Sequence, residues 1–232
     1  MFSYTRLGFR IPGKDQKTTK DTKYHEGFSW WVGSLELAWG DMKFVTLSNL
    51  VLAPWYALGI YWAVSALRLK RIKVSEDPGG RLLHVGLMVL VFMLLYSDRL
   101  ALGPLGLRFV PGSTLVRDLG IILTFVGAGV AIWARHSLGQ YWSGRVTLKV
   151  DHELIRLGPY AHVRHPIYSG LLLAMAGTAL VVGEWRALVG VLLGLVELSR
   201  KAAKEEALLA SEFGDQYQEY RRHAGFLTPR FR

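Results

Sequence analysis

Long apolar segments separated by short polar ones dominate the sequence from residue 44 onward. The clearest is Phe44–Leu67, which has 24 residues and no charge. A helix that crosses a bilayer needs about 20 predominantly apolar residues, so this segment predicts a membrane-spanning helix. Pro54 lies inside it, and membrane helices tolerate proline at the cost of a kink. The basic cluster Arg68–Lys73 follows directly and is typical of a cytoplasmic flank.

The next two apolar runs, Leu82–Ser97 and Leu119–Ala134, have 16 residues each. Both are somewhat short for a span. The first reaches sufficient length if it continues through Asp98–Arg99 with those two charges at the membrane interface. The second is rich in glycine, and Gly127 and Gly129 predict a close approach to a neighbouring helix.

The last two apolar runs, Ile167–Gly183 and Ala187–Leu198, are joined by the short polar turn Val182–Arg186. The second continues as a charged segment with no helix breaker before Gly214, which predicts one long helix lying half in lipid and half in cytosol. The fold class expected is therefore an all-α integral membrane protein with about five transmembrane helices. Its last two helices form a helical hairpin with a long cytosolic extension.

The chain divides by composition into three parts. Residues 1–43 are a polar amino-terminal segment without the apolar core of a signal peptide, and Phe28–Trp39 predicts a helix lying in the membrane interface. Residues 44–134 hold the first three spans. Residues 135–232 hold the hairpin and most of the polar motifs.

Charge predicts which way the spans run. The chain has 28 Lys and Arg against 18 Asp and Glu, a formal net charge of +10. A basic excess suits either nucleic acid or an anionic membrane face, and the apolar runs favour the membrane, so we expect no nucleic-acid partner. With five spans, 17 basic residues fall on the side of the carboxy terminus and 11 on the other. The positive-inside rule therefore predicts a cytoplasmic carboxy terminus.

The chain contains no cysteine. This excludes disulfides, thiolate nucleophiles, cysteine metal sites and iron–sulfur clusters. We expect no metal site.

The segment LGPYAHVRHPIYSG, residues 157–170, collects turn-forming and ionisable residues between two apolar segments. Gly158–Pro159 is a turn signal, and Pro166 suits the first turn of a helix. The loop thus delivers Arg164 and His165 to a helix amino terminus, where free N–H groups and partial positive charge favour an anionic ligand. The alternative is an interfacial loop in which Arg164 extends along the membrane surface and the tyrosines act as belt residues.

A second polar group lies in the long helix after residue 196. Glu197, Lys201 and Glu205 are spaced by four residues and share one face. A solvated, salt-bridged helix leaving the membrane explains most of these charges. Their place at the membrane boundary, on the predicted side of the His165 loop, makes one or two of them candidates for function.

Taken together, HELIRLGPYAHVRHPIYSG, the two following spans, EEALLASEFGDQYQEY and the near-terminal Pro229 resemble the isoprenylcysteine carboxyl methyltransferase family. This family is part of a wider group of small membrane methyltransferases that includes phospholipid N-methyltransferases. The resemblance covers roughly Arg135 to Pro229. It implies a cofactor, S-adenosylmethionine, with S-adenosylhomocysteine as product, and a lipophilic or prenylated acceptor beside membrane lipid.

The resemblance also implies site residues, which makes residues 135–232 the catalytic and cofactor-binding region. Lys201 matches the cation that contacts the acceptor, with Arg200 beside it. Two positions depart from the eukaryotic pattern: Arg145 stands where a cofactor-contacting glutamine is expected, and Lys201 where an arginine is expected. The positions that match cofactor contacts are His152, Glu153, Leu154, Ile155, Tyr160, His165, Pro166, Ile167, Tyr168 and Glu205.

The chemistry expected of such a site needs no cysteine and no catalytic dyad. A sulfonium methyl is already activated, so transfer requires positioning and exclusion of water. A carboxylate acceptor is ionised at neutral pH and needs no general base, whereas an amine or thiol acceptor would need one. Three alternatives remain open: a phospholipid N- or thiol S-methyltransferase, an NADPH-dependent membrane reductase, and a non-catalytic membrane protein.

Overall fold

The computed structural model describes residues 49–66, 72–75, 78–139, 147–149 and 154–230. The chain divides into two units, Met1–Leu47 and Ser48–Arg232, and all the described residues belong to the second.

The described residues are mainly helical. Two short strands and three single-turn 3₁₀ helices connect the longer helices. In chain order the elements are α2 (Ala53–Ala66), β1 (Ile72–Ser75), α3 (Pro78–Tyr96), η1 (Asp98–Leu100), η2 (Gly103–Gly106), α4 (Thr114–Leu138), β2 (Thr147–Lys149), η4 (Gly158–Ala161), α5 (Pro166–Val182), α6 (Trp185–Phe213) and α7 (Asp215–His223).

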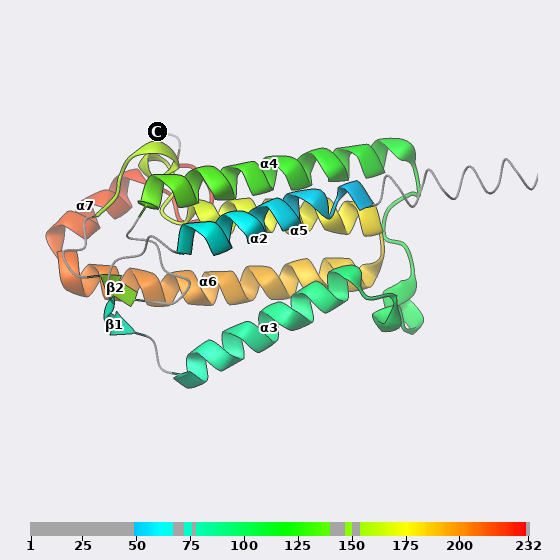
Figure 1. Cartoon of the computed structure of the whole chain (residues 1–232), viewed down its shortest axis with the longest axis horizontal. Helices are drawn as coiled ribbons and strands as arrows, with labels where there is room; N and C mark the ends of the chain where they lie inside the picture. Colours follow the sequence, from blue (N-terminus) through cyan, green and yellow to red (C-terminus); the bar gives the residue numbers. More distant parts are fainter. Residues whose placement is uncertain (1–48, 67–71, 76–77, 140–146, 150–153, 231–232) are drawn as a thin grey trace, which may run out of the picture. The chain divides into compact units, whose positions relative to one another are not determined.

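Helices α2 to α6 lie side by side, with α5 between α4 and α6 and with α3 against α6 (Figure 1). Helix α6 runs back alongside α5 after a two-residue turn. The turn lies at one end of the helices, together with the connection from α3 to α4. The start of α5, the second half of α6 and α7 lie at the opposite end (Figure 1). The polar motifs of the sequence are thus gathered at a single end.

Several local predictions are confirmed. Helix α5 begins at Pro166, as the missing N–H of proline allows. It ends before Gly183, whose left-handed backbone, with φ of 73°, closes the helix and opens the turn to α6. Helix α6 continues for 29 residues until Gly214, where φ is 49°. The expectation of one long helix from the last apolar run into the charged segment is correct.

One expectation about the elements is wrong. The second apolar run does not continue as a helix through Asp98–Arg99, because α3 ends at Tyr96 and a separate 3₁₀ turn follows. The all-α fold class is confirmed for the main elements, with one addition, because β1 and β2 pair as a short antiparallel ribbon. The strands contain Ile72, Val74 and Thr147, and these β-branched residues favour an extended backbone.

Two other expectations fall outside the described residues in whole or in part. The interfacial helix predicted at Phe28–Trp39 lies entirely outside them. The first apolar run is described from residue 49 to residue 66, where α2 supplies 14 residues.

Two helices of the described chain are long and apolar enough to cross a membrane, Gly79–Tyr96 and Thr114–Leu138. Only 17% and 28% of their residues are buried inside the protein, respectively. The core helix of a water-soluble protein would be largely covered. Apolar side chains instead project outward from both helices, as lipid requires; examples are Val85, Val89, Met93, Ile122 and Phe125.

The closest helix packing joins α4 to α5 through small residues. A Cβ placed on Gly127 would lie 2.5 Å from the carbonyl oxygen of Gly170, so only glycine permits this approach. A Cβ on Gly129 would meet nothing within 4 Å. The prediction of a close helix approach is therefore correct for Gly127 and wrong for Gly129.

This difference gives a test of the packing. We expect Gly127→Ala to destabilise the protein by about 1–3 kcal/mol, because the new methyl group overlaps backbone of α5. Gly129→Ala is the matched control, and it should be neutral or stabilising by up to about 1 kcal/mol because alanine favours helix more than glycine does. Thermal unfolding in detergent measures both. Equal melting temperatures for the two variants would contradict the packing of α4 on α5.

Candidate functional site

The histidine loop is held in place by the end of the chain. After η4 the backbone N–H of Arg164 donates to the carbonyl of Gly225 at 2.8 Å, and that of His165 donates to the carbonyl of Phe226 at 3.2 Å. The Phe226 ring also meets the His165 ring edge-on, with 5.2 Å between centroids. The loop is therefore an ordered part of the fold, fixed at the residue before α5.

Two neighbouring carboxylates of α6 face His165. Its Nε2 lies 3.2 Å from Glu206 Oε1, and its Nδ1 lies 3.6 Å from Glu205 Oε2. Arg164 Nε donates to the same Glu206 oxygen at 2.6 Å. The side chains of Arg164 and Glu206 are only 10% and 13% exposed, so Arg164 points into the protein and does not extend along a membrane surface.

These contacts shift the pKa of both partners. Burial acts to raise the pKa of Glu206, but hydrogen bonds from His165 and Arg164 outweigh it and lower the pKa to about 2. Burial acts to lower the pKa of His165, but the carboxylates of Glu205 and Glu206 outweigh it and raise the pKa above its ordinary value. The folded protein thus favours an imidazolium beside two carboxylates.

The shifts predict how stability changes with pH. The contribution of His165 is complete below its ordinary pKa of 6.5 and is lost as pH rises through its raised folded value. The contribution of Glu206 is complete above 4.5 and is lost as pH falls toward about 2. We expect the free energy of unfolding to fall on the alkaline side more in wild type than in His165→Asn. Urea unfolding at several pH values from 6 to 9 measures this free energy. The same change with pH in both proteins would contradict the prediction.

Tyr168 fixes the second carboxylate. Its hydroxyl donates to Glu205 Oε1 at 2.5 Å, and its ring stacks on that of His165 with 5.6 Å between centroids and 6° between planes. The side chain of Glu205 is 23% exposed. It is an oriented carboxylate with surface left for a ligand.

A further polar cluster lies where α6 packs on α3. Glu197 is 2% exposed, and its Oε1 lies 2.8 Å from His84 Nδ1. Lys201 Nζ lies 3.3 Å from His84 Nε2, and Arg200 donates to both oxygens of Glu197 at 2.9 and 3.0 Å. The solvated-helix interpretation is thus wrong for Glu197 and Lys201, because packing against α3 buries the face that carries them.

Tyr168 connects the two clusters. The Lys201 ammonium lies 5.9 Å from the centre of its ring, while its hydroxyl binds Glu205. Lys201, which the resemblance matches to an acceptor contact, and Glu205, which it matches to a cofactor contact, therefore share Tyr168 as a neighbour.

The remaining matched residues lie at different depths. Tyr160, Pro166 and Ile167 are buried, and Ile155 packs against the core that Tyr160 and Ile167 share with Ala134. Leu154 packs separately, against the tyrosines of α7. Among the matched residues, the structure thus brings His165, Tyr168, Lys201 and Glu205 together beside the partly exposed Glu205 carboxylate, with Arg200 next to Lys201 in α6. His152 and Glu153 lie outside the described residues.

Sequence reasoning missed His84, and it gave Glu197 and Glu206 no role beyond membership of the polar group in the long helix. His84 is the clearest omission because an ionisable residue inside an apolar run is itself a sign of function. Glu206 follows Glu205 directly in α6, and the resemblance singled out Glu205 alone, so only the structure shows that Glu206 also faces His165.

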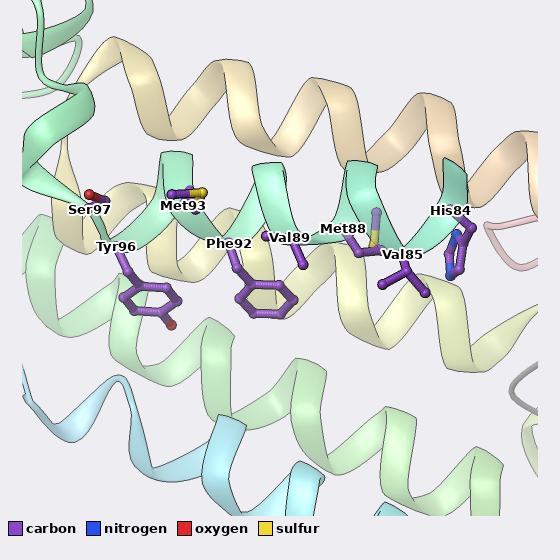
Figure 2. Close-up of a pocket in the computed structure, with 8 residues that line it drawn as sticks. All are labelled: His84, Val85, Met88, Val89, Phe92, Met93, Tyr96 and Ser97. Carbon is purple, nitrogen blue, oxygen red and sulfur yellow. The ribbon is translucent and has the colours of Figure 1, made fainter. Parts of the chain in front are cut away.

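An apolar groove of about 700 Å³ runs along α3. Figure 2 shows His84 at one end of its lining and Ser97 at the other, with aromatic and aliphatic side chains between them. His84 thus belongs both to the lining of the groove and to the polar cluster around Lys201. The lining residues are His84, Val85, Met88, Val89, Phe92, Met93, Tyr96 and Ser97.

Residues 120–211 match the isoprenylcysteine carboxyl methyltransferase family. The protein-S-isoprenylcysteine O-methyltransferase of Schizosaccharomyces pombe is 40% identical over 90 residues, which are 36% of this chain and 37% of that protein. The enzyme of the same name from Saccharomyces cerevisiae is 32% identical over 120 residues, half of each chain. The resemblance seen in the motifs is confirmed, while the chain spans only 37% and 50% of these two relatives.

A solved structure of a eukaryotic intramembrane Ras methyltransferase of this family aligns with a TM-score of 0.49 and 22% identity. The alignment covers 68% of this chain and 54% of that one, a likeness too weak to carry an argument. The family match and the outward apolar faces of α3 and α4 together indicate a helical integral membrane protein.

Proposed function

We propose that this chain is a membrane methyltransferase that uses S-adenosylmethionine and methylates the carboxylate of an isoprenylated cysteine or a similar lipid. One observation carries the proposal. Tyr168 binds Glu205 through its hydroxyl and faces Lys201 through its ring, so the proposed cofactor and acceptor contacts lie in one site. Homologues with that named activity support it.

The polar groups around His165 fit the proposed cofactor. S-adenosylmethionine supplies, when bound, a methyl group activated by a sulfonium. Its ribose hydroxyls and ammonium group are donors, and the partly exposed Glu205 carboxylate accepts hydrogen bonds. The stacked rings of His165 and Tyr168 keep that carboxylate in one orientation. Residues 135–232 are then the catalytic and cofactor-binding region.

The neighbouring cations fit a carboxylate acceptor. Lys201 lies one helical turn before Glu205, so its ammonium can hold the acceptor's carboxylate near the part of the site where Glu205 would bind the cofactor. Arg200 is bound to Glu197 and supports the same region of positive charge. The apolar groove along α3 begins at His84, beside Lys201, and offers surface for a prenyl chain.

The proposed arrangement in the membrane has five spans, with α5 and α6 as the closing hairpin and the second half of α6 in the cytosol. The carboxy terminus and the site then face the cytoplasm, which the excess of basic residues supports. Single cysteines at Ser3 and Ser211 test this, because the chain has none of its own. An impermeant thiol reagent on intact cells should label position 3 and spare position 211, and the reverse pattern would contradict the arrangement.

Methyl transfer by the purified full chain tests the proposed function. Tritiated S-adenosylmethionine and a farnesylated cysteine analogue should give a product that releases methanol in base, since methyl esters hydrolyse and N- or S-methyl groups do not. The analogue with its carboxylate converted to an amide is the matched control. Base-stable product from amine or thiol lipids alone would overturn the carboxyl assignment. Stabilisation by NADPH and not by adenosylhomocysteine would overturn methyl transfer itself.

A further inference from the structure

We propose that His84 of α3 is a positioning residue that holds the Lys201 ammonium in place for the acceptor. Its effect on turnover rests on the proposed function, but its effect on Lys201 does not. No part of the resemblance points to this residue, since it lies before the matched segment.

The two nitrogens of His84 have different partners. Nδ1 lies 2.8 Å from the Glu197 carboxylate, and Nε2 lies 3.3 Å from Lys201 Nζ. A carboxylate only accepts hydrogen bonds and an ammonium only donates them. The ring therefore carries its proton on Nδ1, donates to Glu197, and accepts from Lys201 with the lone pair of Nε2.

Glu197 is itself anchored. Its carboxylate is 2% exposed and accepts two hydrogen bonds from Arg200, one turn along α6. The sequence of contacts from Arg200 through Glu197 and His84 to Lys201 starts and ends on α6 and passes through α3. The position of the Lys201 ammonium is thereby tied to the packing of α3 on α6.

His84 also ends the apolar groove, as Figure 2 shows. A flexible four-carbon stem lets a lysine ammonium reach many positions, so an arrangement that needs it at one point requires an outside constraint. His84 supplies that constraint at the place where the apolar surface of α3 meets the charges of α6.

Two substitutions separate the two contacts of His84. In His84→Asn the amide occupies the place of Nδ1, keeps a donor toward Glu197 and loses the contact with Lys201. In His84→Gln the longer amide reaches the place of Nε2 and keeps an acceptor for Lys201. The direct measurement is the rate at which a soluble amine-reactive reagent labels Lys201, followed by mass spectrometry, with the exposed Lys204 as internal reference.

We expect Lys201 to be labelled about tenfold faster in His84→Asn than in wild type, since one hydrogen bond to a charged group is lost. In His84→Gln the rate should stay within about threefold of wild type. Should His84→Asn not fold, His84→Ala removes both contacts of the ring and leaves the two hydrogen bonds of Arg200 on Glu197. Equal rates in wild type and the Asn or Ala variant would overturn the assignment, whether or not the protein methylates anything.

Turnover gives the second readout. His84→Asn should raise the KM for the farnesylated cysteine analogue about tenfold and leave adenosylhomocysteine affinity unchanged, with His84→Gln restoring most of the loss. His223→Asn, an exposed histidine of α7, is the control. A wild type without methyl transfer means that the proposed function has failed. An active wild type whose KM is unchanged by His84→Asn means that the role of His84 in acceptor binding has failed.

Discussion

Glu205→Ala and His165→Ala should each weaken adenosylhomocysteine binding at least tenfold, about 1.4 kcal/mol. Glu205 is the carboxylate that the site leaves partly exposed, and Tyr168 holds it with a 2.5 Å hydrogen bond. Its removal takes away the carboxylate that we propose accepts hydrogen bonds from the cofactor. His165 acts indirectly, by holding Glu205 in place. Its ring stacks on Tyr168, and its nitrogens face the carboxylates of Glu205 and Glu206.

Calorimetry on the full chain in detergent measures this effect. Glu212→Ala is the matched control, because Glu212 is an exposed glutamate of the same helix. Glu205→Gln adds a distinction, since the amide keeps an acceptor oxygen but loses the charge; it should bind better than Glu205→Ala. Wild-type affinity in both the Glu205→Ala and the His165→Ala variant would remove the cofactor site from this loop.

The helices were largely predictable because their signals are local. Apolar length located α3 and α4, while Pro166 and Gly214 fixed the start of α5 and the end of α6. The error at Tyr96 has a physical reason as well. Hydropathy predicts how long a segment can stay in lipid, but it does not predict where the backbone leaves the α-helical conformation. Here the α-helix gives way to a 3₁₀ turn at Asp98–Leu100.

Which face of a helix meets a neighbour was not predictable at the same level. Gly127 and Gly129 are two residues apart, and that spacing turns about 200° around a helix. Both favour close packing by composition, yet one lies against Gly170 and the other faces open space. A single sequence carries no signal that separates them.

The candidate site was also predictable only where the signal is local in the sequence. His165, Tyr168 and Glu205 could be matched to the family because each lies in a contiguous motif, and the structure brings the three together; their role in cofactor binding stays a prediction. The contact of His84 with Glu197 joins residues 113 positions apart, so it depends on how α3 packs against α6. His152 and Glu153 lie outside the described residues, so for them even the placement stays a prediction.

Lys201→Met should lower kcat/KM for a prenylated carboxylate about ten- to a hundredfold and leave adenosylhomocysteine affinity nearly intact. The loss of a charge-assisted contact costs roughly 1.5–3 kcal/mol, and it falls on the acceptor alone if Lys201 holds the carboxylate. Methionine keeps most of the apolar stem, so the packing against Tyr168 should survive. The measurement pairs initial rates across acceptor concentrations with calorimetry of the cofactor product.

Two neighbouring cations serve as controls for Lys201. Lys204 is exposed, and Lys204→Met should leave kcat/KM unchanged. Arg200 lies about 100° further round the helix and is bound to Glu197. Arg200→Met should therefore act mainly on stability, since it takes one partner from a buried carboxylate. Full turnover in both Lys201→Met and the double variant with Arg200→Met would show that neither cation holds the acceptor, and the negative charge of the acceptor would then need another partner.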